Sequence, residues 1–386
     1  MTVIPAETAA APGLAAQAAA AAAMLLTQAA RQDWRGPDPY DGLFFAWPAW
    51  VTGGRRRRQL IVQAHARAPV DIRRLYRRTH PRIAKALGVF GSVGMRLSRR
   101  GDPDATALAL AALDLLEADR TAGAAAWGYP FDVQTRWSFY PAGSPNVVAT
   151  SFAVQGLLEG AAGADRAAFR NRAVAAARWV LDDLWVQRDG FFAYHPTAGV
   201  NIHNANLLGA VCVHRALGED AAVRERVSRA VDRTLSAQAP DGGFPYGEGA
   251  GLEWRDSFHT GFVLRCLMGM EAIDPAIGDA VRRAAESYLT FFDAAGRAKL
   301  FAEREHPEDA HSAGTGLSTL ALLSGRGAVD PAVLARVTTR TVTAGLRGGH
   351  AVARRYRWGA TTTRYLRWCD AHVALGLADA ALALSG

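Results

Sequence analysis

The feature that most constrains the fold of this chain is an internal repeat of apolar helical segments. Five Ala/Leu-rich segments begin at comparable points, each after a loop that contains Gly, Pro or aromatic residues. They cover 145–160, 201–216, 256–270, 309–323 and 370–384, and 101–118 is a sixth candidate. Arg-rich amphipathic stretches lie between them, at 165–186, 222–238, 277–294 and 331–345. A repeat unit of two helices and about 55 residues is typical of a repeat architecture.

The two kinds of helix predict two concentric layers. A helix that is apolar nearly all round has to be buried on every side, whereas an amphipathic helix leaves one face in water. The alternation typical of strands is almost absent. We therefore predict an all-α fold, an (α/α)6 toroid of residues 99–386, preceded by an Arg-rich and aromatic N-terminal helical extension of residues 1–98. An open solenoid is the alternative, but it needs polar capping repeats, which the sequence does not show.

Charge and cysteine content limit the partners and the compartment. The net charge is +8, and Lys85 and Lys299 are the only lysines among 44 cationic residues. This excess of arginine fits either an anionic partner or a compositional bias, and only its placement can separate the two. The three cysteines are scattered without a CxxC pair, which fits a reducing compartment. The Ala-rich stretch 9–26 lacks the pattern of a signal peptide, so we predict a cytoplasmic protein.

Short turns between the helices carry a resemblance to a known repeat family. Segment 236–244, SAQAPDGGF, is similar to the Q-x-x-D-G-G-[FW] turn of the squalene-cyclase and protein-prenyltransferase repeats. Segment 186–192, VQRDGFF, is a degenerate second copy, and the loop 127–132, WGYPFD, lies at the matching place in an earlier repeat. The resemblance covers about residues 100–386 and implies an α/α toroid. Toroids also carry sugar epimerases, glycosidases and polysaccharide lyases, so the resemblance does not select a reaction.

A second resemblance points toward glycans. The stretches 127–137 and 143–152, followed by DSFHTGF at 256–262, resemble uncharacterised proteins of prokaryotic polysaccharide-biosynthesis clusters. This resemblance implies glycan chemistry without identifying the reaction.

The histidines near the predicted inner-helix starts are the strongest indication of a site. In a toroid these N-termini form a ring around one mouth of the central cavity, where their free N–H groups attract anions. The histidines lie 56, 52 and 61 residues apart, at positions 203, 259, 311 and 372. Such recurrence predicts that their side chains converge on one cavity, although N-caps and structural histidines are the alternative for each position. The catalytic candidates are Tyr129, His203, Asp256, His259, His311, Asp370 and His372.

Three of these histidines follow a carboxylate by two or three residues. The pairs are Asp256 with His259, Asp309 with His311, and Asp370 with His372. A neighbouring carboxylate can fix the tautomer of a histidine and raise its basicity, as a general base requires. Imidazole and carboxylate can also hold zinc or manganese, but no HxxxH or HExxH spacing supports this. We therefore predict no metal ligands, leave the cofactor unassigned and keep a divalent metal as an alternative.

Aromatic residues and arginines gather in the loops over the same mouth. Aromatic faces beside guanidinium groups are suited to sugar rings that carry carboxylate or phosphate groups. The candidates for substrate binding are Trp127, Arg136, Asn146, Asn204, Asn206, Trp254, Arg255, Tyr356, Arg357, Trp358 and Arg364.

The segment 34–80 is a candidate interaction surface. It contains four consecutive arginines at 55–58, with Trp47 and Trp50 shortly before them. This composition predicts docking on a membrane surface or on a partner such as a glycosyltransferase, with an ordinary solvated surface as the alternative. No zinc finger, helix-turn-helix or RNA-binding signature accompanies it, so we predict no nucleic-acid partner.

The function favoured by these patterns is an enzyme acting on an anionic sugar of a surface polysaccharide or glycoconjugate. Epimerisation and β-elimination both begin with proton abstraction, for which His259 is the base and His203 or Tyr129 the opposing acid. Hydrolysis requires two carboxylates, here Asp256 with Asp104 or Asp370. One alternative is an isoprenoid cyclase or transferase that uses a prenyl diphosphate, although a DxDD motif is missing. The other is a non-catalytic scaffold that binds glycans or partner proteins.

Overall fold

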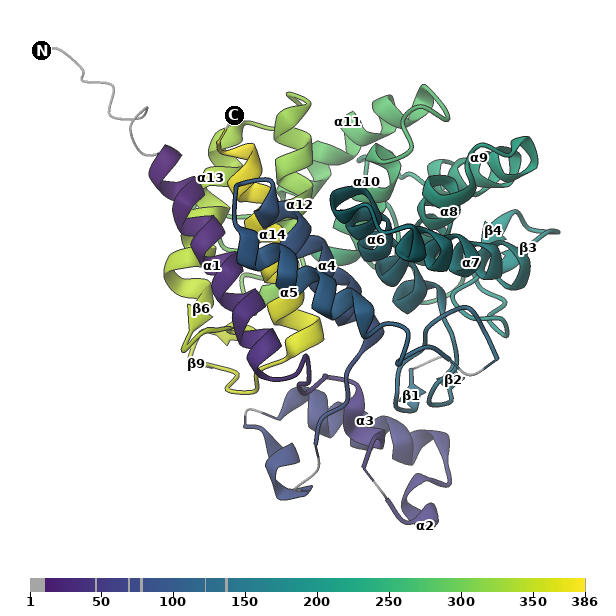
Figure 1. Ribbon diagram of the computed structural model, residues 1–386, viewed down its shortest axis with the longest axis horizontal. Helices are drawn as coiled ribbons and strands as arrows, with labels where there is room; N and C mark the ends of the chain where they lie inside the picture. The colour runs from purple at the N-terminus through teal and green to yellow at the C-terminus, as the bar shows by residue number, and fades with distance from the viewer. Residues whose placement is uncertain are drawn as a thin grey trace, which may run out of the picture.

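The computed structural model describes residues 11–45, 47–68, 70–76, 79–121, 123–135 and 138–385. Most of this chain folds into two layers of helices (Figure 1). The inner layer consists of α4 (Ala84–Ser98), α6 (Val147–Ala164), α8 (His203–Leu217), α10 (Ser257–Met268), α12 (Ala310–Gly325) and α14 (Ala371–Ala383). Each inner helix packs against the next one, and α14 packs against α4, so the ring is closed.

The outer layer covers the inner ring with one helix for each inner helix. It consists of α1 (Ala11–Arg31), α5 (Pro103–Asp114), α7 (Ala167–Asp183), α9 (Ala221–Leu235), α11 (Ala276–Leu289) and α13 (Pro331–Arg340). The outer helices α5, α7, α9, α11 and α13 each pack on the inner helix that precedes them, and α1 packs on α14. The described chain is therefore an (α/α)6 toroid, which confirms the predicted fold class.

The chain is divided differently from the prediction near its N-terminus. Helices α1 and α4 lie within residues 1–98, yet α1 is an outer helix and α4 an inner one. The segment 101–118 contains the outer helix α5 rather than an inner helix. Glycines explain the place of α4, because a Cβ at Gly88 would lie 2.3 Å from the Phe152 carbonyl oxygen. Only glycine allows α4 to approach α6 this closely inside the ring.

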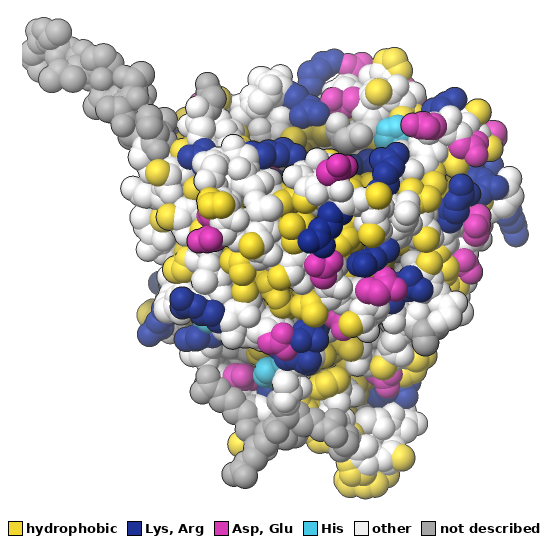
Figure 2. Space-filling model, viewed as in Figure 1, with side chains coloured by type: hydrophobic (Ala, Val, Ile, Leu, Met, Phe, Trp, Pro, Cys, Tyr) yellow, Lys and Arg dark blue, Asp and Glu magenta, His cyan; other side chains and the backbone are white. Residues whose placement is uncertain are grey.

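Residues 32–83 leave the toroid and cross the end at which the inner helices begin. This N-terminal excursion contains η1 (Asp41–Leu43), α2 (Ala49–Thr52), α3 (Arg55–Arg67) and η2 (Ile72–Tyr76). It lies at the bottom of Figure 1, and hydrophobic side chains gather at its tip, where α2 lies (Figure 2). Two buried ion pairs hold it. Arg73 contacts Asp41 at 2.6 Å, and Arg367, far along the chain, contacts Asp38 at 2.5 Å.

Short antiparallel strands shape the loops over the same end. The two-stranded hairpins are β1 (Val133–Gln134) with β2 (Phe139–Tyr140), β3 (Trp185–Val186) with β4 (Phe191–Phe192), and β6 (Leu346–Arg347) with β7 (His350–Ala351). A three-stranded sheet joins β5 (Glu308–Asp309), β8 (Arg354–Tyr356) and β9 (Gly359–Ala360). Two π-helical turns, η3 (Thr341–Gly345) and η4 (Leu366–Asp370), follow α13 and precede α14.

Among the described residues, two helices have the length and apolar composition of a membrane span, namely α1 (over Gly13–Arg31) and α6. Both are packed into the double ring: α1 lies against α14, and α6 lies between α4 and α8. Packing within the toroid therefore explains the apolar character of both helices. The cytoplasmic location stays a prediction.

The D-G-G turn at 241–243 follows the outer helix α9 and packs closely against the next outer helix, α11. Gly242 has φ +80°, and a Cβ there would lie 2.2 Å from the Arg283 carbonyl oxygen on α11. The Gln238 amide donates hydrogen bonds to the carbonyls of Gly242 and Ala280, at 2.9 and 2.8 Å. Gly296 repeats the arrangement one repeat later. It has φ +76°, and a Cβ there would lie 2.4 Å from the Arg336 carbonyl oxygen on α13. The repeated motif therefore sets the spacing of the outer layer.

We predict that Gly242→Ala destabilises the protein more than Gly251→Ala. Both glycines have φ +80°, so each substitution forces an alanine into the left-handed region, at about 1–2 kcal/mol. Gly251 has open space around the missing Cβ, whereas Gly242 faces the backbone of α11, which adds about 1–3 kcal/mol of overpacking. Urea unfolding of the two variants measures the difference. Equal losses of unfolding free energy in the two variants would show that close packing of this turn on α11 does not contribute to stability.

Candidate functional site

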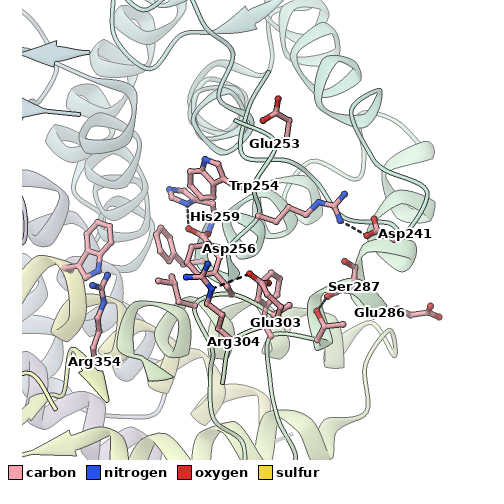
Figure 3. A pocket seen from close by; sticks show the side chains of 18 of the residues that line it. Asp241, Glu253, Trp254, Asp256, His259, Glu286, Ser287, Glu303, Arg304 and Arg354 are labelled. Atoms are coloured by element: carbon pink, nitrogen blue, oxygen red, sulfur yellow. Dashed lines mark hydrogen bonds and ion pairs between the residues drawn. The ribbon is translucent and has the colours of Figure 1, made fainter. Parts of the chain in front are cut away.

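A cavity of about 1120 Å³ opens beside the start of α10, at the end of the toroid where the inner helices begin. The loop before α10 and the loop after α11 form most of its wall (Figure 3). Three residues far away in sequence complete it: Tyr40 from the N-terminal excursion, Arg354 from β8 and Trp368 from η4. Of the predicted residues, Trp254, Arg255, Asp256 and His259 line this cavity.

Asp256 and His259 form a hydrogen-bonded pair in the cavity wall. One carboxylate oxygen of Asp256 accepts from the His259 backbone N–H at 2.8 Å and so caps α10. The other carboxylate oxygen lies 2.8 Å from His259 Nδ1. Because an ionised carboxylate only accepts hydrogen bonds, Nδ1 carries the proton and Nε2 of the neutral ring keeps a free lone pair. The N-cap and the orientation of a base are thus combined in one carboxylate.

Aromatic rings surround His259 on several sides. Phe258 lies 4.1 Å and Tyr246 4.7 Å from the imidazole, measured between ring centroids. Trp254 stacks on Tyr246 at 4.2 Å and also lines the cavity. The side chain of His259 keeps 22% of its surface exposed. The imidazole is therefore held by its neighbours but still reachable from the cavity.

Tyr40 brings a protonated phenol to the same cavity. Its ring lies 5.4 Å from that of Trp368, edge to face. Burial raises the pKa of Tyr40 to about 12, an effect that the nearby Arg367 guanidinium partly opposes. The phenol thus keeps its proton at neutral pH and can donate it to a bound molecule.

Arginines and carboxylates alternate around the rest of the wall. Arg354 Nε donates to Asp309 at 3.2 Å, and Arg255 donates to Asp241 at 2.6 Å. Figure 3 shows Arg304 near the Asp256–His259 pair, with Glu286 pointing away from this pair. Arg354 and Arg304 line the cavity together with His259, and Arg304 also lies 3.8 Å from the Glu303 carboxylate.

A second group of basic side chains lies on the axis of the ring, behind Phe258 and Trp368. The rings of His311 and His372 are 4.2 Å apart, and His311 is 4.5 Å from Phe258. Lys85 lies beside them, with its Nζ 4.5 Å from the centre of the Phe152 ring. Burial, and then the nearby Lys85 charge, hold the pKa of both histidines well below the usual range.

This axial cluster, Lys85 with His311 and His372, is buried and poorly paired. Within the described residues, both ring nitrogens of His372 and Nε2 of His311 lack a hydrogen-bond partner. Burial and the nearby Arg367 charge also hold the pKa of Lys85 well below its usual range. None of the three side chains lines the cavity next to His259.

Two of the three predicted Asp–His pairs are replaced by other partners. Asp309 caps α12 and contacts Arg354 instead of His311. Asp370 lies 2.8 Å from His350 Nδ1 and accepts from the Ala351 N–H, so it does not orient His372. The hairpin of β6 and β7 brings His350 to Asp370, a long-range pairing that local spacing cannot reveal.

His203 faces the outer layer rather than the cavity. Its Nδ1 lies 3.2 Å from the Thr234 hydroxyl on α9, and burial lowers its pKa to about 4. Asn206 points the same way and donates to the Ala230 carbonyl at 2.7 Å. The structure therefore does not place His203 opposite His259.

The other predicted residues of the early repeats also have local partners. Asn146 caps α6 by accepting from the Ala149 N–H at 2.9 Å. Trp127 is fully buried, and its indole donates to the Leu116 carbonyl at 2.8 Å. The Arg367 guanidinium carbon lies 5.1 Å from the centre of the Tyr129 ring, and Tyr129 is not part of the cavity wall. Asn204 differs, because it shares a small adjoining cleft with Asp256 and His259.

The remaining predicted binding residues lie away from the cavity or outside the described chain. Tyr356, Arg357 and Trp358 belong to the exposed β8–β9 hairpin, and Trp358 is 87% exposed. Arg364 is also exposed and does not line the cavity. Arg136 lies outside the described residues.

Most of the cavity wall lies outside the predicted set of site residues, including five residues that matter for its chemistry: Tyr40, Phe258, Arg304, Arg354 and Trp368. Arg354 belongs to the Arg-rich run 354–357, which could have pointed to it. Tyr40 had no local indication, because it comes from an excursion more than 200 residues before His259.

The described residues contain no cluster of three or more His, Cys, Asp or Glu side chains suited to a metal ion. The cavity around His259 combines one imidazole held by a carboxylate, one protonated phenol and several guanidinium groups.

No family model and no curated protein matches this chain. Solved structures do match its fold. An unsaturated glucuronyl hydrolase specific for heparin aligns with TM-score 0.64 and 11% identity over 96% of this chain and 97% of its own. Cellobiose 2-epimerase from Bacillus thermoamylovorans aligns with TM-score 0.59 and 12% identity over 77% and 87%. A polysaccharide lyase aligns with TM-score 0.54 and 11% identity over 78% and 89%. Identities this low show the fold alone.

We predict that Lys85→Met stabilises the protein at neutral pH. The unfolded chain protonates Lys85 readily, whereas the apolar ring axis does not, so wild type loses stability below pH 10.5. Methionine fills similar space without a polar group, and we expect the free energy of unfolding to rise by about 1–3 kcal/mol at pH 7. The gain should shrink as the pH rises toward 10.5.

The control is Lys299→Met at the other lysine, whose Nζ donates to the Ala302 carbonyl at 2.5 Å. This variant should lose a little stability at every pH. Destabilisation by Lys85→Met would contradict the picture of an unpaired axial lysine.

Proposed function

We propose that this protein is a sugar-modifying enzyme that moves a proton on an anionic sugar in the cavity beside α10. The observation that carries this proposal is the Asp256–His259 pair, whose 2.8 Å hydrogen bond leaves Nε2 of His259 as a base in the cavity wall. Trp254 and Trp368 offer flat faces for a sugar ring. The epimerase, lyase and hydrolase activities named for similar folds are compatible with such a site.

The first step is the removal of a proton from a carbon next to a carboxylate or carbonyl group. Nε2 of His259 takes the proton, and the electron pair of the C–H bond moves onto the carbonyl oxygen. The developing negative charge is stabilised by Arg354 or Arg304. Asp256 stabilises the resulting imidazolium through the hydrogen bond at Nδ1.

Tyr40 is the opposing acid in the second step. In an epimerisation, its phenol protonates the same carbon from the other face and regains a proton from solvent. In a β-elimination, it protonates the leaving oxygen as the carbon–oxygen bond breaks and a double bond forms. In both cases His259 then releases its proton to solvent and Tyr40 takes one up, so the steps balance without an oxidant or reductant.

The other hypotheses receive less support from the described residues. Asp104 is exposed on the outer helix α5, and Asp370 is bound to His350, so neither joins Asp256 for hydrolysis. A prenyl chain requires an apolar cavity, whereas this wall carries Asp241, Glu253, Arg255 and Arg304. The link to surface polysaccharides remains part of the proposal and rests on the sequence resemblance.

The test is proton exchange in D₂O. Wild-type protein is incubated with uronic-acid oligosaccharides and nucleotide-linked sugars, and NMR follows deuterium entering at carbon, inversion at carbon or a new alkene. We expect exchange with at least one acidic sugar. His259→Gln should reduce it by about 10²–10⁴-fold, the usual contribution of a general base. His214→Gln, at the far end of α8, is the matched control and should leave exchange unchanged.

Asp256→Asn separates the two roles of this carboxylate. Asparagine caps helices as well as aspartate, so the variant should keep the wild-type melting temperature. It cannot stabilise an imidazolium, so exchange should fall by at least about 10-fold. Binding of acidic sugars without exchange in wild type would contradict the enzyme and support the scaffold hypothesis instead.

A further inference from the structure

The N-terminal excursion carries large apolar side chains on its outer surface. Trp50 is 75% exposed, Leu60 70%, Val70 57% and Leu75 81%. They come from α2, α3, η2 and the turn between α3 and η2, and we call them, together with Arg56 and Arg67, the basal surface. Figure 2 shows hydrophobic side chains at the lower tip of the molecule, where α2 lies. Several exposed large apolar side chains in one region usually mark an interaction site.

One face of the helix α3 is buried and the other is exposed. Val62 and His65 are buried, and α3 packs through this side on η1. The exposed residues Arg56, Leu60 and Arg67 recur at intervals of four and seven and therefore share the opposite face. The buried side also meets the toroid, where the Tyr365 hydroxyl donates to the His65 carbonyl at 3.3 Å, while the other side faces outward.

The charge of this segment is strongly basic. Residues 47–75 contain seven arginines and one carboxylate, Asp71, which is largely buried beside Arg73 at 3.7 Å. Arg58 is turned inward, where it donates to the Gln134 side chain at 2.9 Å, but Arg56 and Arg67 are exposed. On other surfaces several arginines have carboxylate partners, as on α11, where Arg282 contacts Asp279. The basal surface therefore complements a dense, anionic partner.

We propose that the basal surface docks on an anionic lipid bilayer. Its arginines would contact the lipid phosphates, while Trp50, Leu60 and Leu75 enter the boundary between headgroups and acyl chains. Tryptophan at this boundary is typical because its ring is apolar and its N–H remains near water. Tyr40 belongs to the same excursion, so docking would bring the cavity near the membrane surface.

The test is co-sedimentation of the full-length protein with vesicles of phosphatidylcholine, with and without 30% phosphatidylglycerol, a composition of about physiological anionic content. Wild type should bind the anionic vesicles and lose this binding at high salt. Arg56→Gln/Arg67→Gln should weaken the partition coefficient by about 30-fold, since each arginine contributes about 1 kcal/mol. Trp50→Ser/Leu60→Ser should weaken binding as well, and the loss should persist at low salt.

The charge-matched control is Arg170→Gln/Arg178→Gln on the outer helix α7, which removes two exposed arginines elsewhere. This variant should bind like wild type. Equal binding by both arginine variants, or no vesicle binding by wild type, would overturn the proposal. So would a dimer in solution that Trp50→Ser dissociates, because the surface would then be a protein interface. None of these outcomes depends on the sugar reaction proposed above.

Discussion

Closure of the inner ring is the constraint on which the rest of the structure depends. Helix α14 packs against α4 and closes the ring. Because an outer helix returns the chain after each inner one, the chain enters every inner helix of the described toroid from the same end. Loops, hairpins and the N-terminal excursion all collect at this end. Asp256 sits there as the cap of α10 and orients His259, while Tyr40, Arg354 and Trp368 arrive from segments that only the closed ring brings together.

Burial decides what each of the four recurring histidines can do. His259 stands at the edge of the mouth, keeps part of its surface exposed and has a carboxylate partner. His311 and His372 lie further in, where burial holds their pKa low and no carboxylate reaches them. His203 points outward to α9. Equivalent positions in a repeat therefore give one candidate base, two axial groups and one structural residue.

The repeat could be read from the sequence because the contrast between apolar and amphipathic helices is periodic. The same periodicity identified the His259 start and its carboxylate. It failed for α4, whose Gly-rich sequence hides an inner helix, and for α1, which closes the outer layer from the other end of the chain. Tyr40 and the Asp370–His350 pair could not be predicted, because both depend on contacts between distant segments.

The central claim is that Asp256 holds His259 as the Nδ1–H tautomer with Nε2 free toward the cavity. Nitrogen-15 NMR of histidine-labelled protein measures this directly, because protonated and unprotonated ring nitrogens have well-separated shifts. In the neutral imidazole of His259, assigned through the His259→Gln variant, Nδ1 should be protonated in wild type, and this preference should weaken in Asp256→Asn. A neutral His259 protonated at Nε2 in wild type would contradict the account, since no base would then face the cavity.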